Sequence, residues 1–64
     1  MKVNGEVITP LFPVTLETFL LDRNYDLTTI AVERNGEIVP KATYSEVKLF
    51  DEDVLEIVQF VGGG

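Results

Sequence analysis

Two Asn-Gly pairs, Asn4-Gly5 and Asn35-Gly36, constrain the fold of this 64-residue chain more than any other feature of its sequence. Asn-Gly suits the two left-handed positions of a type I′ turn, which joins neighbouring antiparallel strands. Apolar and β-branched residues flank both pairs, so we predict two tight hairpins. The predicted strands are residues 1–3 and 6–9 in the first hairpin, and 29–34 and 37–40 in the second.

A short helix is expected between the hairpins. Pro13 interrupts regular strand pairing because proline lacks the backbone donor, and Thr15 is a suitable N-cap. Asn24 is suited to the left-handed residue that ends a helix, which gives a helix over residues 16–23. Its expected buried stripe consists of Leu16, Phe19 and Leu20, broadened by Leu21.

The second half of the chain ends in the clearest strand of the sequence. Thr43-Tyr44-Ser45-Glu46 has the spacing of a capping box and predicts a single helical turn. Asp51-Glu52-Asp53 is read as a solvated polar turn, and Val54–Phe60 is rich in strand-forming residues. Val61-Gly62-Gly63-Gly64 completes the chain.

This order of elements predicts an α+β fold of the β-grasp (ubiquitin-like) type. A helix packed on one face of a mixed sheet of about four to five strands buries the apolar stripe economically. The last strand is expected in the centre, parallel to the first strand, because a long crossover separates the two. We therefore divide the chain into a β-grasp domain, residues 1–60, and a flexible C-terminal glycine tail, residues 61–64.

The side-chain inventory argues against catalysis. The chain has no Cys and no His, and Ser45 is its only serine. Disulfides, thiol nucleophiles, imidazole-based triads and most zinc or iron sites are thereby excluded. We expect no bound cofactor and no metal, and a protein that is acted upon instead of an enzyme.

The charge balance points to the kind of partner. Eleven acidic and five basic residues give a net charge of −6, which disfavours nucleic acid and anionic membranes. A basic protein surface is the complementary partner, although excess acid also serves solubility alone. Neither a targeting segment nor an apolar run approaching ~18 residues is visible, so a cytoplasmic location is expected.

The three glycines Gly62, Gly63 and Gly64 allow two interpretations. They are either a frayed end or tag remnant, or a segment that threads through a narrow passage in another protein. The four residues beyond Phe60 span up to roughly 13–14 Å when extended, which is enough to place a terminal carboxylate in a partner's pocket.

The strand Leu55–Val61 running into Gly62-Gly63-Gly64 resembles the end of the ubiquitin-like sulfur carriers. The similarity is greatest to the ThiS family of thiamin biosynthesis. It covers essentially the whole chain, including the segment Ile30–Pro40 with its Asn-Gly turn and the acidic turn before the last strand. Glu52 stands where this family commonly has glycine, so a mildly strained, positive φ is expected there.

The resemblance implies a protein co-substrate. An E1-like adenylating enzyme (ThiF type) would use ATP to adenylate the carboxylate of Gly64. A sulfur-relay protein such as a cysteine desulfurase would then supply sulfur for a thiocarboxylate. Thiazole synthase (ThiG type) would consume that sulfur. Gly62 and Gly63 would thread the tail into the active site of a partner enzyme.

Strand alternation also predicts a docking surface. Leu55 and Ile57 should face the helix, which places Val58 and Phe60 on the opposite face, beside Val61 and the tail. Exposed apolar residues at this position would contact the partner enzymes, unless a loop or the sheet edge covers them. Other functions remain open: the small subunit of molybdopterin synthase, which is also a sulfur carrier, a protein-modifying ubiquitin-like tag, and a β-grasp binding module whose glycines are incidental.

Overall fold

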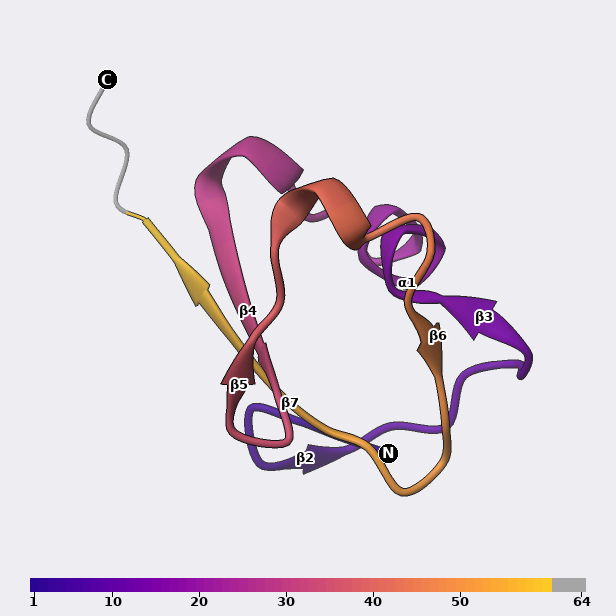
Figure 1. The fold of residues 1–64 in the computed structure, drawn as a ribbon. Helices are drawn as coiled ribbons and strands as arrows, with labels where there is room; N and C mark the ends of the chain where they lie inside the picture. The colour runs from indigo at the N-terminus through magenta and orange to yellow at the C-terminus, as the bar shows by residue number, and fades with distance from the viewer. Residues whose placement is uncertain (61–64) are drawn as a thin grey trace.

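The computed structural model describes residues 1–60 (Figure 1). In chain order their elements are β1 (Lys2–Val3), β2 (Glu6–Val7), β3 (Val14–Thr15), α1 (Leu16–Asp22), the 3₁₀ helix η1 (Leu27–Thr29), β4 (Ile30–Arg34), β5 (Glu37–Ile38), the 3₁₀ helix η2 (Lys41–Thr43), β6 (Lys48–Leu49) and β7 (Val54–Gln59).

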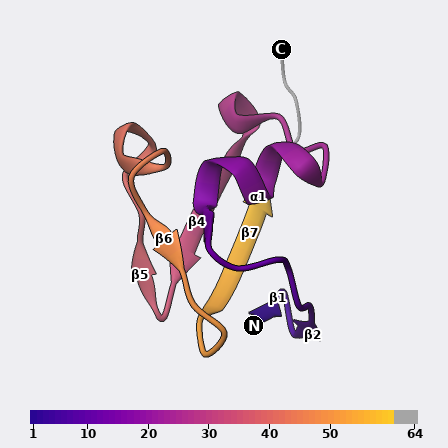
Figure 2. The ribbon, with the colours of Figure 1, turned by 90° about the vertical axis from the view of Figure 1, so that its right-hand side faces the viewer.

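Five strands form the main sheet in the order β2-β1-β7-β4-β5. The central strand β7 is parallel to β1 and antiparallel to β4. Figure 2 shows α1 in front of β4 and β7, so the helix covers one face of the sheet. This mixed sheet with a helix on one face confirms the predicted β-grasp architecture, including the central, parallel placement of the last strand.

The core lies between α1 and the sheet. From the helix it takes Leu16, Phe19 and Leu20, as predicted, and from β7 it takes Leu55 and Ile57. The remaining buried apolar residues are Met1, Val3, Ile30, Val32, Tyr44 and Leu49. Within the described residues, no helix has the length and apolar character that crossing a bilayer requires.

The predicted helix is correct at both ends to within one residue. The Thr15 hydroxyl accepts a hydrogen bond from the Thr18 N–H at 3.2 Å, and Asn24 has a positive φ of 63° just after the helix. The prediction for Leu21 is wrong, because its side chain is 54% exposed. Successive helical residues are about 100° apart, so a position next to the buried stripe turns out to solvent in a helix this short.

Several local features differ from the sequence prediction. A second, two-stranded sheet pairs β3 with β6, and the 3₁₀ turn η2 precedes the predicted helical turn at 43–46. The Thr43 hydroxyl donates to the Pro40 carbonyl at 2.7 Å. The turn therefore begins at Pro40, before Thr43, where a capping box would begin it. Glu52 is not among the residues with positive φ, so the strain expected there is absent.

Both predicted Asn-Gly turns are present, and their asparagines bond to β7. Asn4 and Asn35 each have a φ of 51°. The Asn4 amide accepts from the Ile57 N–H at 2.7 Å and donates to the Ile57 carbonyl at 3.3 Å. The Asn35 side chain accepts from the Val54 N–H at 2.9 Å. Asn4 therefore extends the short strand β1 along β7 with a side chain in place of backbone.

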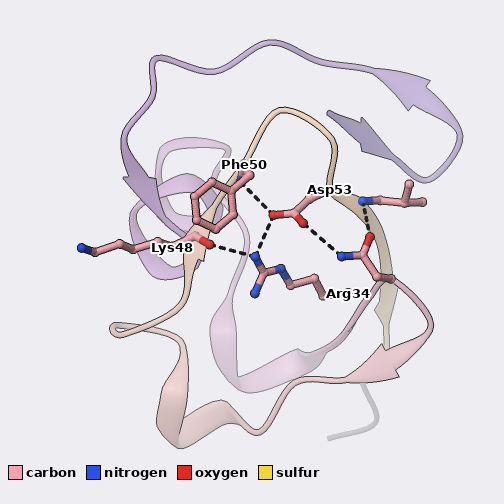
Figure 3. A network of polar contacts seen from close by, with 6 residues as sticks. Arg34, Lys48, Phe50 and Asp53 are labelled. Atoms are coloured by element: carbon pink, nitrogen blue, oxygen red, sulfur yellow. Dashed lines mark hydrogen bonds and ion pairs between the residues drawn. The ribbon is translucent and has the colours of Figure 1, made fainter.

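A partly buried ion pair fixes the loop that leads into β7 (Figure 3). The Asp53 carboxylate accepts hydrogen bonds from Arg34 Nη2 at 3.0 Å, from the Phe50 N–H at 2.8 Å and from Asn35 Nδ2 at 3.0 Å. Arg34 Nη2 also donates to the Lys48 carbonyl at 3.0 Å. The network joins the β4–β5 turn to both ends of the loop between β6 and β7.

The prediction of a fully solvated acidic turn is wrong for Asp53, because only 4% of this residue is exposed. Burial by itself would raise the pKa of its carboxyl group. The hydrogen bonds from Arg34, Phe50 and Asn35 outweigh that effect and hold the pKa below its ordinary value. The ionised carboxylate is thus the form that the folded chain stabilises.

Two substitutions of Asn4 should separate the contribution of its side-chain hydrogen bonds to stability from that of its left-handed backbone. Asn4→Gly keeps the left-handed backbone but removes both hydrogen bonds to Ile57, so the free energy of unfolding should fall by about 1–2 kcal/mol in urea titrations. Asn4→Ala should lose about 1 kcal/mol more because alanine disfavours positive φ. Asn24→Gly is the control, since Asn24 has positive φ and no side-chain hydrogen bond among residues 1–60. Equal losses for Asn4→Gly and Asn24→Gly would contradict the role of the amide.

Asp53 should make stability fall in acid. Because its folded pKa is depressed, its stabilisation is complete above the unfolded pKa of about 3.9 and is lost as the pH falls through the lower, folded value. Asp53→Asn should lower the free energy of unfolding at pH 7 by about 3 kcal/mol, and the gap to the native chain should narrow below about pH 4. Urea titrations across that range test this, with the exposed Asp51→Asn as control. A gap that is independent of pH would refute it.

Candidate functional site

The candidate site is the end of β7 and the sheet face around it. The Phe60 N–H donates to the Thr29 carbonyl at 2.7 Å, which holds the last described residue against the start of β4. The predicted tail residues lie outside the described residues, as does Val61 of the predicted docking surface. They are Gly62, Gly63 and Gly64.

Alternation along β7 separates core residues from surface residues as predicted. Leu55 and Ile57 are 0% and 8% exposed and pack in the core. Val58 and Phe60 are each 54% exposed. Among the residues that the structure describes, neither a loop nor the sheet edge covers them fully, so two large apolar side chains lie at the surface just before residue 61.

The strand register extends this surface across the sheet. Lys2 lies opposite Val54 and Val7, Ala31 lies opposite Val58, and Glu33 lies opposite both Glu56 and Ile38. Directly paired residues share a face, so these side chains project from the face that α1 does not cover. We call this surface the open face; its members are Lys2, Val7, Ala31, Glu33, Ile38, Val54, Glu56 and Val58.

The open face is largely apolar and accessible. Val7 is 70% exposed, Ile38 66% and Val54 42%, in addition to Val58. Lys2, Glu33 and Glu56 lie among these apolar side chains, and a surface that mixes exposed apolar and charged residues in this way is typical of a protein–protein contact. Sequence reasoning identified Val58 and Phe60 but missed Val7 and Ile38, because strands of two residues carry too short an alternation to assign a face.

A separate hollow of about 450 Å³ lies near the start of β7. Phe12 and Phe50 line it, with exposed fractions of 37% and 55%. β7 extends about 20 Å from this loop to the tail, so the hollow does not adjoin residue 60. Sequence reasoning also missed this feature, since both phenylalanines lie in loops without regular periodicity.

The other potentially reactive side chains of residues 1–60 do not form a catalytic arrangement. Ser45, the only serine of the chain, is exposed in the turn after η2, and Lys41 and Lys48 are exposed. The Asp51 carboxylate lies 3.4 Å from the Met1 ammonium group. The Asp53 carboxylate is occupied by its three hydrogen bonds.

Comparisons with known proteins bear on the family to which the chain belongs. The sequence model of the ThiS family matches residues 1–64. The sulfur carrier protein ThiS of Bacillus subtilis is 48% identical over 50 residues, which cover 78% of this chain and 76% of that protein. A thiazole synthase of Paramagnetospirillum magneticum is 47% identical over all 64 residues, although the chain spans only 20% of that protein's length.

A solved structure gives the same result at the level of the fold. The crystal structure of the thiamine biosynthesis protein ThiS from Geobacter metallireducens superposes with a TM-score of 0.82 at 26% identity. The alignment covers 98% of this chain and 96% of that one. With a family model spanning every residue and a carrier protein at 48% identity, the chain belongs to the ThiS family, whose members include a sulfur carrier protein and a thiamine biosynthesis protein.

Proposed function

We propose that this chain is a sulfur carrier of thiamin biosynthesis, that it delivers sulfur for thiazole formation, and that it is a protein co-substrate instead of an enzyme. The observation that carries the proposal is the exposed apolar surface at Val58 and Phe60, directly before a glycine-rich segment. A carrier needs a surface that partner enzymes bind and a reactive end that they can reach. Membership of the ThiS family supports the same function.

The sulfur would be carried on the carboxylate of Gly64. A carboxylate is a poor acyl electrophile, so it first reacts with ATP to give an acyl-adenylate and pyrophosphate. A hydrosulfide equivalent then attacks the carbonyl carbon, AMP leaves, and a thiocarboxylate remains. The activating enzyme would supply the groups that stabilise the charge in these steps.

The tail glycines suit this chemistry. Without a Cβ, Gly63 and Gly64 leave the carbonyl open to attack, and together with Gly62 they pass through a narrow channel. Ordering such a segment costs about 1–2 kcal/mol per residue, which favours release of the carrier after turnover. ATP is then a substrate of the activating enzyme, and the carrier itself holds no cofactor.

Three partners follow from this function. An E1-like adenylating enzyme of the ThiF type would activate Gly64, and a cysteine desulfurase or similar relay protein would provide sulfur. The third partner is thiazole synthase. This chain is similar over all of its 64 residues to one segment of the Paramagnetospirillum thiazole synthase. The similarity supports thiazole synthase as a partner, because domains that are joined in one polypeptide in one organism often interact as separate chains in another. A cytoplasmic location, without nucleic acid or membrane as partner, is consistent with these proteins and with the net charge of −6.

The docking residues on the carrier would be Val58, Phe60 and Val61. Apolar side chains that become fully buried in a contact contribute most of its binding free energy. Their position beside the tail would let one contact both hold the carrier and direct Gly64 into the active site.

The mass of the intact chain tests the carrier function. Incubation with ATP, the activating enzyme and sulfide should exchange one oxygen for one sulfur, and a variant lacking Gly64 should show no such gain. Because the chain has no cysteine, alkylation of the product by iodoacetamide should report the thiocarboxylate alone.

The controls for this experiment distinguish the alternatives. The activating enzyme must first be shown to modify another carrier. No adduct with a proven ThiF-type enzyme would contradict the thiamin function, and an adduct formed only with the molybdopterin-pathway enzyme would assign the chain to that branch. A native chain that binds a partner but forms no adduct with either activating enzyme, and whose binding is unchanged by deletion of Gly63-Gly64, would indicate a binding module.

Replacement of Phe60 tests the docking surface. Phe60→Ala should fold with nearly unchanged stability because the side chain is half exposed, but the KM of the activating enzyme for the carrier should rise about tenfold. Leu21→Ala is a matched control, since Leu21 is equally exposed and lies on α1 instead of β7 or the residues that follow it. Equal KM values for Phe60→Ala and the native chain would remove Phe60 from the docking surface.

A further inference from the structure

The last hydrogen bond along the described part of β7 and its end is donated by Phe60. Its N–H bonds to the Thr29 carbonyl at 2.7 Å. The register of β4 and β7 places Ile30 opposite Gln59, so Thr29 and Phe60 form the next pair. A hydrogen-bonded antiparallel pair exchanges two bonds, but the Thr29 N–H donates to the Asp26 carbonyl at 3.0 Å instead. Phe60 is therefore held on this side by a single bond.

The other edge of β7 gives Phe60 no support within the described chain. β1 and the Asn4 side chain bond to this edge only as far as Ile57. The Phe60 side chain is 54% exposed, so packing holds it only in part. The bond to the Thr29 carbonyl thus largely sets where residue 60 lies, and with it where residues 61–64 begin.

Asp26 builds the turn that presents this carbonyl. It is the N-cap of η1 (Leu27–Thr29), which lies at the same end of the sheet as the end of β7 (Figure 1). Its carboxylate accepts from the Thr28 N–H at 2.9 Å and from the Thr28 hydroxyl at 2.6 Å. Its carbonyl accepts from the Thr29 N–H and hydroxyl, both at 3.0 Å. Leu27 packs against the core, which fixes the turn to the domain.

The Asp26 side chain makes its contacts to η1 and not to the core. It is exposed, and its carboxylate is in neither of the ion pairs found among residues 1–60. The hydrogen bonds from the Thr28 hydroxyl and N–H hold the pKa of its carboxyl group below the ordinary value, so the charged acceptor is present at neutral pH. The influence of this side chain is therefore directed to η1 and the Thr29 carbonyl.

We infer that Asp26 is a positioning residue for the activation of Gly64: acting through η1 and the Thr29 carbonyl, it fixes Phe60 as the point from which residues 61–64 extend. The inference rests on the proposed function, because the reaction at Gly64 is taken from it. Four residues span roughly 13–14 Å, so the position of Phe60 decides which region of a docked enzyme Gly64 can reach. If the Phe60 bond opened, at least one more residue would have to be ordered in each turnover, which lowers the reactive fraction about five- to thirtyfold.

Asp26→Ala tests the effect on the reaction. The substitution removes the acceptor of both Thr28 bonds, so kcat/KM for pyrophosphate release by the activating enzyme should fall about fivefold. Asp26→Asn removes the same charge but keeps an oxygen acceptor at the N-cap, so it should retain at least about half of the native kcat/KM. Equal losses in the two variants would assign the effect to charge and would overturn the inference.

The bond at Phe60 can be followed on the carrier alone. Hydrogen exchange measured by NMR should show about tenfold less protection of the Phe60 amide in Asp26→Ala, because the acceptor carbonyl is no longer held. The Ile57 amide bonds to Asn4, so its protection should change by less than about threefold. Unchanged protection of Phe60 relative to Ile57 in Asp26→Ala would overturn the inference, whatever the kinetics.

Thr15→Ala is the matched control for stability. Thr15 is the N-cap of α1 and accepts from the Thr18 N–H at 3.2 Å, so its replacement removes a comparable cap from another helix. This variant should lower the melting temperature about as much as Asp26→Ala does, with kcat/KM and the relative protection of Phe60 unchanged. An equal fall of kcat/KM in Thr15→Ala would assign the effect to general stability and would overturn the inference.

The native chain separates this inference from the proposed function. Absence of both pyrophosphate release and a thiocarboxylate, with an activating enzyme proven on another carrier, would overturn the proposed function and the inference with it. A native chain that is activated, alongside an Asp26→Ala variant with the same kcat/KM, would overturn the inference alone.

Discussion

The fold depends on the pairing of β7 on both of its edges. β1 binds one edge in parallel and β4 binds the other antiparallel, so the first, middle and last parts of the sequence meet at this strand. β1 has only two residues, and the side chain of Asn4 continues the pairing by bonding both backbone groups of Ile57. Because β7 also supplies Leu55 and Ile57 to the core, loss of its pairing would expose backbone and core together.

A small core explains why polar contacts matter so much in this chain. A domain of this length buries only about 60% of the surface of its unfolded chain, so few apolar contacts are available to position each loop. The ion pair of Arg34 and Asp53 adds polar contacts to these apolar ones. Arg34 also donates to the Lys48 carbonyl and Asp53 accepts from the Phe50 N–H, so the loop before β7 is held by hydrogen bonds. Once this loop is fixed, the register of β7 is fixed, and with it the position of Phe60 and the residues that follow.

The sequence predicts the parts of this structure that depend on local signals. The Asn-Gly turns, the N-cap Thr15, the stripe of Leu16, Phe19 and Leu20, and the alternation along β7 are all present as expected. What the sequence does not reveal are the contacts between distant segments. The β3–β6 pair, the burial of Asp53 and the exposure of Leu21 each depend on which segment packs nearby, and residues such as Val7 and Ile38 join the open face only through strand register.

Because side chains alternate along β7, one face of the strand contributes to stability and the other face is accessible to other proteins. Its inward residues bury apolar surface and tolerate little change, whereas its outward residues Val54, Glu56 and Val58 remain accessible and contribute little to the core. A strand of this kind can change its partners by substitution on one face while the other face preserves the fold.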